Sequence, residues 1–386
     1  MNKNLSSVSA ELLEMAASGR PRPAIDYALG QISDGLPADI LILQVLADVQ
    51  REVGRLWQSN QWSVAQEHAA TAVIDGVLGA IGLEQRTSPA PQRGNVLVAC
   101  VEEEYHSLPA RMGAERLRYD GWNVTFLGAS VPAHDLQQFV VDADPDVTVL
   151  SCTLSLHLPG AARSISALAD VGAVVVVAGA GFGDTSDRAT RLGASGWIGP
   201  SVNATSVLER PLPPARSATF ENTESAQLQL QDHELVEACM TEMFKAIPRM
   251  TSFSAQQLNS SRRDLAYILR YLTIAIDLDE PHLFDEFITW LQRVLIAREV
   301  PPAVLLASLQ MVGDVVHRAG LEQSAALCQA AQRPLVDTHQ VHDQRPLVTS
   351  VRPPTSAELA QLVCTPQPKT FSSLVGDGQV PPGVGQ

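Results

Sequence analysis

From Asn95 onward, short runs of β-branched residues alternate with stretches of helical periodicity. A chain with this alternation folds into a parallel sheet whose strands are joined by crossover helices. The runs that we expect to form strands are NVLVAC, NVTFLG, DVTVLSC, AVVVVAG and the weaker GWIG. The helices expected between them are His106 to Tyr119, Ala133 to Ala143, Gly160 to Val171 and Asp184 to Leu192. Residues 94–208 are therefore predicted to form a doubly wound α/β domain.

The chain before this domain has helical periodicity. Apolar residues recur at helical spacing over 38–58 and 64–83, and turn residues interrupt the pattern around them. We expect residues 1–86 to form a bundle of about four helices. The segment RTSPAPQRG, residues 86–94, has the prolines and polar residues of a linker.

Helical signals also dominate the chain after the α/β domain. Residues 209–230 are rich in Pro and then in polar residues, so we expect a linker there. Residues 231–333 are predicted to be a second helical domain, and residues 334–386, rich in Pro, Gln, Ser and Val, to be a largely disordered tail. The predicted fold class is α/β plus all-α: an N-terminal four-helix bundle, a flavodoxin-like parallel-sheet domain and a C-terminal helical domain.

Composition excludes several classes of protein. The formal net charge is -15, with no compensating run of Lys and Arg, so we expect no nucleic-acid partner. The longest apolar run, Val171 to Gly181, is too short to cross a bilayer, and the N-terminus lacks the pattern of a secretory signal. We therefore expect a cytoplasmic protein that does not bind membranes. The five cysteines have no CxxC spacing, so neither a disulfide framework nor a zinc site is expected.

The turn after the first strand is the first place to look for chemistry, because ligands of parallel sheets bind outside the carboxyl ends of the strands. This turn, residues 101–106, has no glycine, and the later Gly179–Gly183 stretch lacks the context of a dinucleotide loop. What the turn offers is a carboxylate, Glu104, two residues before an imidazole, His106. An imidazole binds transition metals well when a carboxylate orients its other nitrogen. Taken alone, the pair is also compatible with a solvated surface loop.

The α/β segment resembles the cobalamin-binding domains of corrinoid methyltransferases, mutases and light-responsive regulators. The residues that carry the resemblance are Glu104-Tyr105-His106-Ser107-Leu108-Pro109, then Ser151-Cys152-Thr153-Leu154, then Ala178-Gly179 followed by Ala180-Gly181-Phe182. The resemblance implies that His106 is the lower axial ligand of the cobalt, supported by hydrogen bonds from Glu104 and Ser151. It also implies that the nucleotide tail of the cofactor enters a slot lined by the residues Ser151, Thr153, Gly179, Gly181 and Phe182.

Two positions depart from the motif of that family. Pro109 stands where the family has Gly, and Ala178 replaces the first Gly of a pair. Proline is acceptable in the first turn of a helix, where its missing N–H has no partner to lose, and alanine is the smallest change. We expect altered tail binding with the His106 ligand retained.

The helical bundle carries a second resemblance. The spacing Trp57-x9-Glu67-His68 is similar to the cap that covers the upper cobalt face in light-sensing cobalamin regulators. The resemblance implies that Trp57 packs on an adenosyl group and that Glu67 and His68 line its pocket. Without it, Trp57 would be read as a core residue and the other two as polar residues of a first helical turn.

The C-terminal helices resemble the globin-like domain of photocobilins, sensors that combine cobalamin with biliverdin. A linear tetrapyrrole needs cations for its propionates, a carboxylate for its pyrrole N–H groups and flat apolar walls. The residues that we expect to provide them are Arg262, Arg263, Arg270, Tyr271, Asp279, His282 and Trp290. Aromatic residues at helical spacing also suit an ordinary core, so a globin-like module without a chromophore is the alternative. No cysteine motif indicates a thioether, so binding would be noncovalent.

Together these features predict a photoreceptor rather than an enzyme. It would bind adenosylcobalamin and biliverdin, and a light-driven change of homo-oligomeric assembly, or an unknown signalling partner, would carry the output. The alternative is a corrinoid carrier protein for a methyltransferase, which would share the His106 loop and use its cobalt to carry methyl groups.

Overall fold

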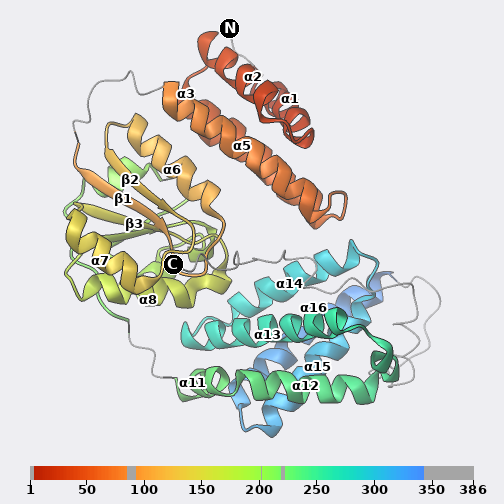
Figure 1. Cartoon of the computed structure of the whole chain (residues 1–386). Helices are drawn as coiled ribbons and strands as arrows, with labels where there is room; N and C mark the ends of the chain where they lie inside the picture. The colour runs from red at the N-terminus through yellow and green to blue at the C-terminus, as the bar shows by residue number, and fades with distance from the viewer. Residues whose placement is uncertain (1–3, 85–92, 201, 219–221, 343–386) are drawn as a thin grey trace, which may run out of the picture. The chain divides into compact units, whose positions relative to one another are not determined.

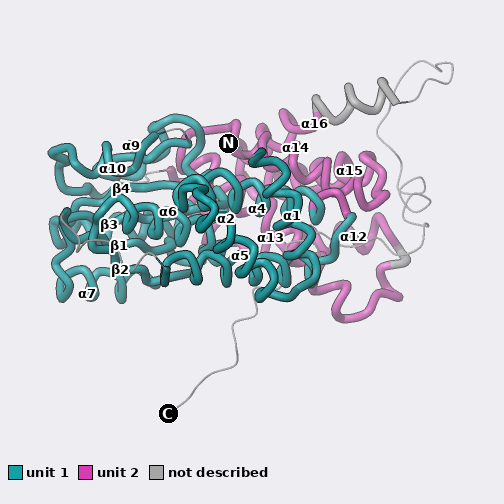
Figure 2. Tube along the Cα trace, turned by 90° about the horizontal axis from the view of Figure 1, so that it is seen from above, with its two compact units in different colours: residues 1–57, 61–219 teal, residues 58–60, 220–386 magenta. Residues whose placement is uncertain are grey.

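The computed structural model describes residues 4–84, 93–200, 202–218 and 222–342. The chain divides into two compact units (Figure 2). Unit 1 comprises Met1–Trp57 and Gln61–Thr219, and unit 2 comprises Gln58–Asn60 and Phe220–Gln386. Unit 1 combines a helical bundle with a parallel sheet, whereas every element in the described part of unit 2 after Asn222 is a helix.

The N-terminal part of unit 1 is a bundle of four helical rods, as predicted (Figure 1). The rods are α1 (Leu5–Ala17), α2 (Pro21–Ser33), the continuous run of α3 (Ala38–Ile40), η1 (Leu41–Leu46) and α4 (Ala47–Gln58), and α5 (Val64–Glu84). The Asn4 side chain caps α1 by accepting a hydrogen bond from the Ser6 N–H at 3.2 Å. Pro21 begins α2, where the missing N–H costs nothing. Sequence patterning therefore found the bundle correctly.

The third rod contains a wider turn that the sequence did not predict. Its η1 segment is a π-helix, in which each hydrogen bond spans one residue more than in an α-helix. Its buried residues, Leu41, Ile42, Val45 and Leu46, face the core of the bundle. The helical periodicity of 38–58 does not distinguish a single wider turn from an α-helical one.

The second part of unit 1 is a five-stranded parallel sheet in the order β2-β1-β3-β4-β5. Its strands are β1 (Asn95–Cys100), β2 (Asn123–Gly128), β3 (Val147–Ser151), β4 (Val175–Ala178) and β5 (Gly196–Ile198). All five predicted strands are present. The register pairs Cys100 of β1 with Ser151 of β3, and Ser151 with Ala178 of β4, so the three central strands end at one level. The flavodoxin-like prediction is confirmed.

Helices connect the strands and cover the sheet. They are α6 (Ser107–Tyr119), α7 (Ala133–Ala143), η3 (Ser155–His157), α8 (Leu158–Ala169), η4 (Ala180–Phe182), α9 (Asp187–Arg191) and α10 (Ala204–Leu208). On one face, Ala114 and Leu117 of α6 and Val207 of α10 pack on strand residues such as Val98 and Val176. Pro109 lies in the first turn of α6, which tolerates its missing N–H as expected.

The helix α6 also joins the sheet to the bundle. Leu108 and Met112 of α6 belong to the buried core cluster of the bundle. Arg111 of α6 pairs with Asp75 of α5 at 2.5 Å, and Arg116 pairs with Asp39 of α3 at 2.7 Å. We call the loop that ends at His106 the ligand loop, and the part of the bundle with Trp57, Glu67 and His68 the lid. Because α6 begins directly after His106, these contacts connect the ligand loop with the helices of the lid.

Unit 2 contains more helix than the sequence predicted. Its elements are α11 (Thr223–Leu230), α12 (Asp232–Ala246), η5 (Pro248–Ser252), α13 (Ala255–Asp277), α14 (His282–Ile296), α15 (Pro302–Arg318) and α16 (Glu322–His342). The linker prediction for 209–230 is wrong over 223–230, where α11 forms. Asn222 caps α11, and Glu224 is buried because it accepts hydrogen bonds from Gln323 and Ser324 at the start of α16. The tail prediction for 334–386 is wrong up to residue 342, and the rest lies outside the described residues.

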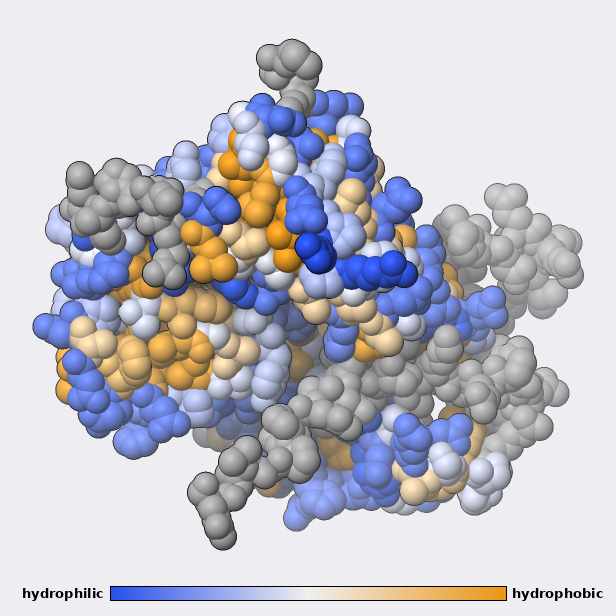
Figure 3. Space-filling model, turned by 45° about the horizontal axis from the view of Figure 1, so that its top comes forward, coloured by the Kyte–Doolittle hydropathy of each residue, from blue (hydrophilic) through white to orange (hydrophobic). Residues whose placement is uncertain are grey.

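Apolar side chains are exposed on parts of the surface of the described residues. Figure 3 shows apolar patches among hydrophilic side chains on the face that it presents. Large apolar side chains that stay exposed include Leu83, Tyr119, Phe139 and Val141. Within the described part of the chain, we find no helix that combines the length and the apolar character needed to cross a membrane.

Candidate functional site

The loop that follows β1 places the predicted ligand His106 at the carboxyl end of the sheet. Val101 continues the pairing of β1 with β3, because its N–H donates to Ser151 O at 3.0 Å. The loop then turns sharply at Glu103, whose φ is 69°. His106 directly precedes the first residue of α6. Its side chain is 53% exposed, whereas the Glu104 side chain is fully buried beneath it. The imidazole is therefore held from below and presented outward.

Glu104 is the centre of the hydrogen-bond network of this loop. One oxygen, Oε1, accepts from the His106 backbone N–H at 2.8 Å and lies 2.6 Å from His106 Nδ1. The other, Oε2, accepts from the N–H groups of Thr153 at 2.7 Å and Leu154 at 3.0 Å, on the loop after β3. An ionised carboxylate has only acceptors, so all four donors are satisfied by one side chain. The arrangement fixes the Nδ1–H tautomer of His106 and leaves Nε2 free to bind a metal.

The charges of this pair are coupled. Burial raises the pKa of the Glu104 carboxyl, but the hydrogen bond and charge of His106, together with backbone N–H groups, outweigh it and lower the pKa to about 2. Desolvation lowers the pKa of His106, but the hydrogen bond and charge of Glu104, and then the charge of Glu67, outweigh it and raise the pKa. A more basic imidazole is a stronger metal ligand once its Nε2 is deprotonated.

Three residues that the sequence analysis missed shape the same loop. Ser130, with φ 47°, follows β2; its N–H donates to Glu104 O at 2.8 Å and its hydroxyl accepts from Glu103 N–H at 3.2 Å. Arg163 of α8 pairs with Glu102 at 2.5 Å. Gly160 of α8 is also needed, because a Cβ there would overlap the carbonyl oxygen of Glu102. Their roles depend on tertiary contacts, so nothing in the local sequence could have identified them.

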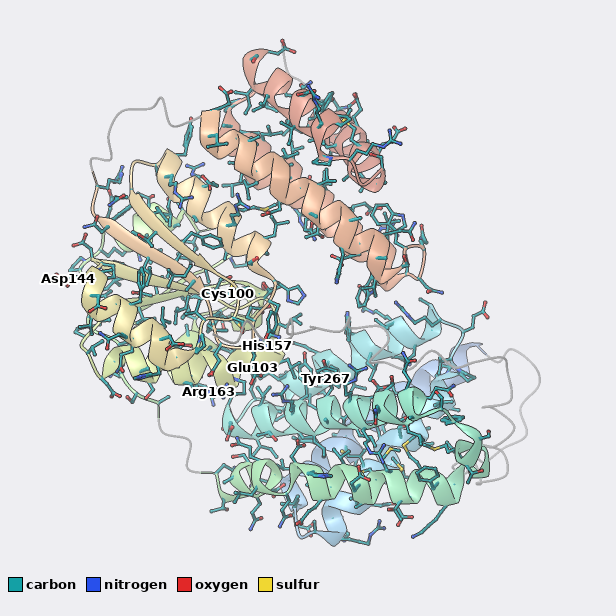
Figure 4. All side chains as sticks on the ribbon, viewed as in Figure 1. Cys100, Glu103, Asp144, His157, Arg163 and Tyr267 are labelled. Carbon is teal, nitrogen blue, oxygen red and sulfur yellow. The ribbon has the colours of Figure 1, made fainter. Side chains whose placement is uncertain are left out.

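The loops after β3 and β4 meet beside the His106 loop. Gly179 has φ 107°, and a Cβ there would overlap the carbonyl oxygen of Cys152. A Cβ on Gly181 would lie 2.8 Å from Cys152 Sγ, and the Gly181 N–H donates to Cys152 O at 3.0 Å. Phe182 is fully buried. Figure 4 shows Cys100, Glu103 and His157 at this end of the sheet, with Asp144 at the opposite end. The residues predicted to line the slot for the nucleotide tail therefore lie at the carboxyl end of β3 and in the loops after β3 and β4.

Two observations test whether this edge fits cobalamin. The Thr153 hydroxyl is buried and has no hydrogen-bond partner, which is unusual unless a bound group provides one. Among the described residues, no cluster of three or more His, Cys, Asp or Glu side chains could hold a bare metal ion. The oriented imidazole of His106, the buried Thr153 hydroxyl and the close-packed glycine loops together offer a metal ligand and a polar group to one large cofactor. The residues present therefore fit the group.

The predicted lid residues lie at the facing ends of α4 and α5. Trp57 is half-buried near the end of α4. Glu67 and His68 lie in the first turn of α5, where Glu67 Oε2 contacts His68 Nδ1. The charge of Glu67 raises the pKa of His106, so the carboxylate lies within electrostatic reach of the ligand loop. The two sequence motifs, 39 residues apart, therefore act on the same region of unit 1.

In unit 2 the structure brings together part of the predicted bilin site. Tyr271 of α13 stacks on Phe287 of α14, with ring centroids 3.9 Å apart, and Phe287 lies 6.3 Å from Trp290. Arg262 pairs with Glu237 of α12 at 2.5 Å. The other predicted polar residues are exposed, Arg263 and Arg270 on α13 and Asp279 and His282 around the turn before α14. A flat aromatic wall is present, and the cation and carboxylate assignments stay predictions.

Comparison with protein families assigns three segments of the chain. Residues 94–208 and residues 10–81 each match a family described as B12 binding domain. Residues 218–338 match the family described as Phycobilisome protein. The chain therefore contains B12-binding domains followed by a domain of the phycobilisome type, in the order that the sequence analysis predicted.

Individual relatives match only part of the chain. HTH-type transcriptional repressor CarH of Myxococcus xanthus is 31% identical over 145 residues, 38% of this chain and 48% of that protein. HTH-type transcriptional repressor CarA of the same organism is 39% identical over 88 residues, 23% of this chain and 30% of that protein. The chain thus spans about half the length, or less, of these relatives. The monomethylamine corrinoid protein of Methanosarcina barkeri is 13% identical, with a TM-score of 0.44 over 50% of this chain and 93% of that one.

Proposed function

We propose that this protein is a photoreceptor that binds adenosylcobalamin, with His106 as lower ligand and Trp57, Glu67 and His68 around the upper one. The observation that supports the proposal most is that the oriented imidazole of His106 and the motif of Trp57, Glu67 and His68 lie in one compact unit and are joined through α6. When bound, adenosylcobalamin supplies a cobalt–carbon bond that light breaks. Glu104 holds the Nδ1 proton of His106 and directs Nε2 to the metal, and the lid excludes water from the upper face.

We propose that the output is a change of assembly rather than an enzymatic reaction. The lid is joined to the sheet through α6, by the pairs Arg111–Asp75 and Arg116–Asp39. If the lid repacked after loss of the adenosyl group, the ion pairs between the bundle and α6 would shift. A local change at the cofactor would then reach the surface of unit 1. The change would alter self-association or expose a surface for a signalling partner. The absence of a nucleic-acid partner stays a prediction from the net charge.

Illumination of the reconstituted protein tests this function. We expect protein loaded with adenosylcobalamin in the dark to change its absorbance permanently on illumination, and its elution volume in size-exclusion chromatography to change with it. Free adenosylcobalamin in the same buffer is the control for photolysis without protein. Binding followed by an unchanged elution volume would contradict the photoreceptor function. Retention of methylcobalamin with no effect of light on assembly would favour the corrinoid carrier.

We further propose that unit 2 binds biliverdin noncovalently. The match of residues 218–338 to the phycobilisome family and the aromatic wall of Tyr271, Phe287 and Trp290 support this. Burial raises the pKa of Cys239 and of Cys328 to about 12, so neither thiol readily provides the thiolate that a thioether requires.

Mixing the purified protein with biliverdin tests the second chromophore. We expect a red-shifted, sharpened band that is lost when the protein is denatured, since the attachment is noncovalent. Tyr271→Leu keeps an apolar side chain but removes the ring. It should raise the Kd for biliverdin, measured from the band, about tenfold, because a stacked aromatic contact and its buried area are lost. Tyr119→Leu, an exposed tyrosine of unit 1, is the matched control. No band with the wild-type protein would indicate a module without a chromophore.

A further inference from the structure

A chain of hydrogen bonds connects α4 with the carboxylate of Glu67 on α5. Gln50 Nε2 donates to Thr71 Oγ1 at 3.0 Å, and Thr71 Oγ1 donates to Glu67 Oε1 at 2.9 Å. Thr71 lies one helical turn after Glu67, and all three side chains are half-buried. None of the motifs in the sequence includes Gln50 or Thr71.

The donors in this series of hydrogen bonds all point toward Glu67, which favours one orientation of its carboxylate. A hydroxyl has one proton, and the two acceptors within its reach are Glu67 Oε1 at 2.9 Å and Gln50 Oε1 at 3.3 Å. The shorter contact to the charged oxygen is the stronger one. The Gln50 amide then donates to the oxygen of the hydroxyl, so the O–H of Thr71 stays directed at Glu67. The carboxylate has two further acceptor positions beyond those used by Thr71 and His68.

Gly54 leaves open space on the face of α4 that carries Gln50. Gln50, Gly54 and Trp57 are spaced i, i+4 and i+7, so they share one face of α4. That face lies toward α5, because Gln50 contacts Thr71. A Cβ on Gly54 would meet no atom within 4 Å, although a glycine inside a helix costs about 1 kcal/mol relative to alanine. A side chain at position 54 would therefore meet no neighbour on this face.

We propose that Gln50 and Thr71 are positioning residues that hold Glu67 so that the site selects a cobalamin whose upper ligand carries ribose hydroxyls. The proposal rests on the proposed function and goes beyond it by naming what determines the upper ligand. A ribose has two neighbouring hydroxyl donors, and a held carboxylate presents free acceptor positions to them. A methyl group offers no donor, so its binding does not depend on the orientation of Glu67.

Dark equilibrium binding of adenosylcobalamin and methylcobalamin to the full-length protein tests the proposal. Thr71→Val is close in shape and lacks the donor; it should raise the Kd for adenosylcobalamin about tenfold and leave the Kd for methylcobalamin within about twofold. Thr71→Ser, which keeps the hydroxyl, should stay within about threefold of wild type for both ligands. Gln50→Leu should act in the same direction as Thr71→Val, with Gln44→Leu, an exposed glutamine of η1, as the control.

The outcomes separate the inference from the proposed function. If Thr71→Val lowered the affinity for both cobalamins equally, or for neither, the positioning role would be overturned. A wild-type protein that binds both ligands equally would also overturn it while cobalamin binding stands. A wild-type protein that binds neither would overturn the proposed function itself. Melting temperatures of the ligand-free Val and Ser variants should agree within about 3 °C, which shows that both are folded.

Discussion

Replacing Glu104 with glutamine is expected to lower the free energy of unfolding of ligand-free unit 1 by about 3 kcal/mol. Glu104 accepts four hydrogen bonds through two oxygens, from His106, Thr153 and Leu154. An amide has one oxygen, so its NH2 group would face N–H donors whichever way it turned. The loss would be measured by urea unfolding followed through tryptophan fluorescence. A Trp290→Phe background removes the signal of unit 2, since the other four tryptophans lie in unit 1.

The same carboxylate predicts a dependence of stability on pH. The folded pKa of Glu104, about 2, is below its ordinary value of 4.5, so its contribution is complete above pH 4.5 and is lost as the pH falls toward 2. The size is about 3 kcal/mol, from about 1.4 kcal/mol per unit of pKa. The Glu104→Gln variant should lack this part of the acid dependence. Glu103→Gln, at the half-buried neighbouring residue, is the control, and equal behaviour of the two variants would contradict the central role of Glu104.

Replacing His106 with alanine is expected to convert the spectrum of bound adenosylcobalamin to the base-off form. The affinity should fall about a hundredfold, at the upper end of what is lost when groups around a metal are removed. The fold should be retained, because the imidazole is 53% exposed and Glu104 keeps its three backbone donors. Absorbance titration in the dark measures both effects.

Two other histidines of unit 1 make the experiment specific. His134→Ala removes an exposed imidazole of α7 and should change nothing. His157→Ala removes the imidazole that lies at the same end of the sheet as the His106 loop (Figure 4). A base-off spectrum in His157→Ala, with an unchanged spectrum in His106→Ala, would move the ligand assignment to His157.

The fold was largely predictable because periodicity reports burial directly. The β-branched runs gave all five strands, and the helical spacing gave the rods of the bundle. The prediction failed where polar residues have tertiary partners. The polar composition of 209–230 predicts a linker, yet residues 223–230 form α11, because Glu224 is stabilised by N–H groups of α16 about 100 residues later. Local composition does not contain that information.

The candidate site divides in the same way. Glu104 and His106 could be found because they are neighbours in the sequence, and so could Glu67 and His68. Gly160, Ser130 and Arg163 could not, because each acts on the loop from a different element. Gln50 and Thr71 are likewise ordinary helical residues until the pairing of α4 with α5 is known. Sequence therefore predicts candidate groups that are neighbours along the chain and misses the residues that act on them from other elements.

The π-helical turn of η1 sets the rotational phase of everything after it on the same rod. It accommodates one residue more than an α-helical turn would, and each residue of an α-helix advances the side chains by about 100°. Deleting one residue between Leu41 and Leu46 would let the rod close into a regular α-helix. Gln50, Gly54 and Trp57 would then swing by about 100° around the axis, relative to the residues before the turn. The wider turn, about three helical turns before Trp57, thus sets the angular position of that residue on the rod.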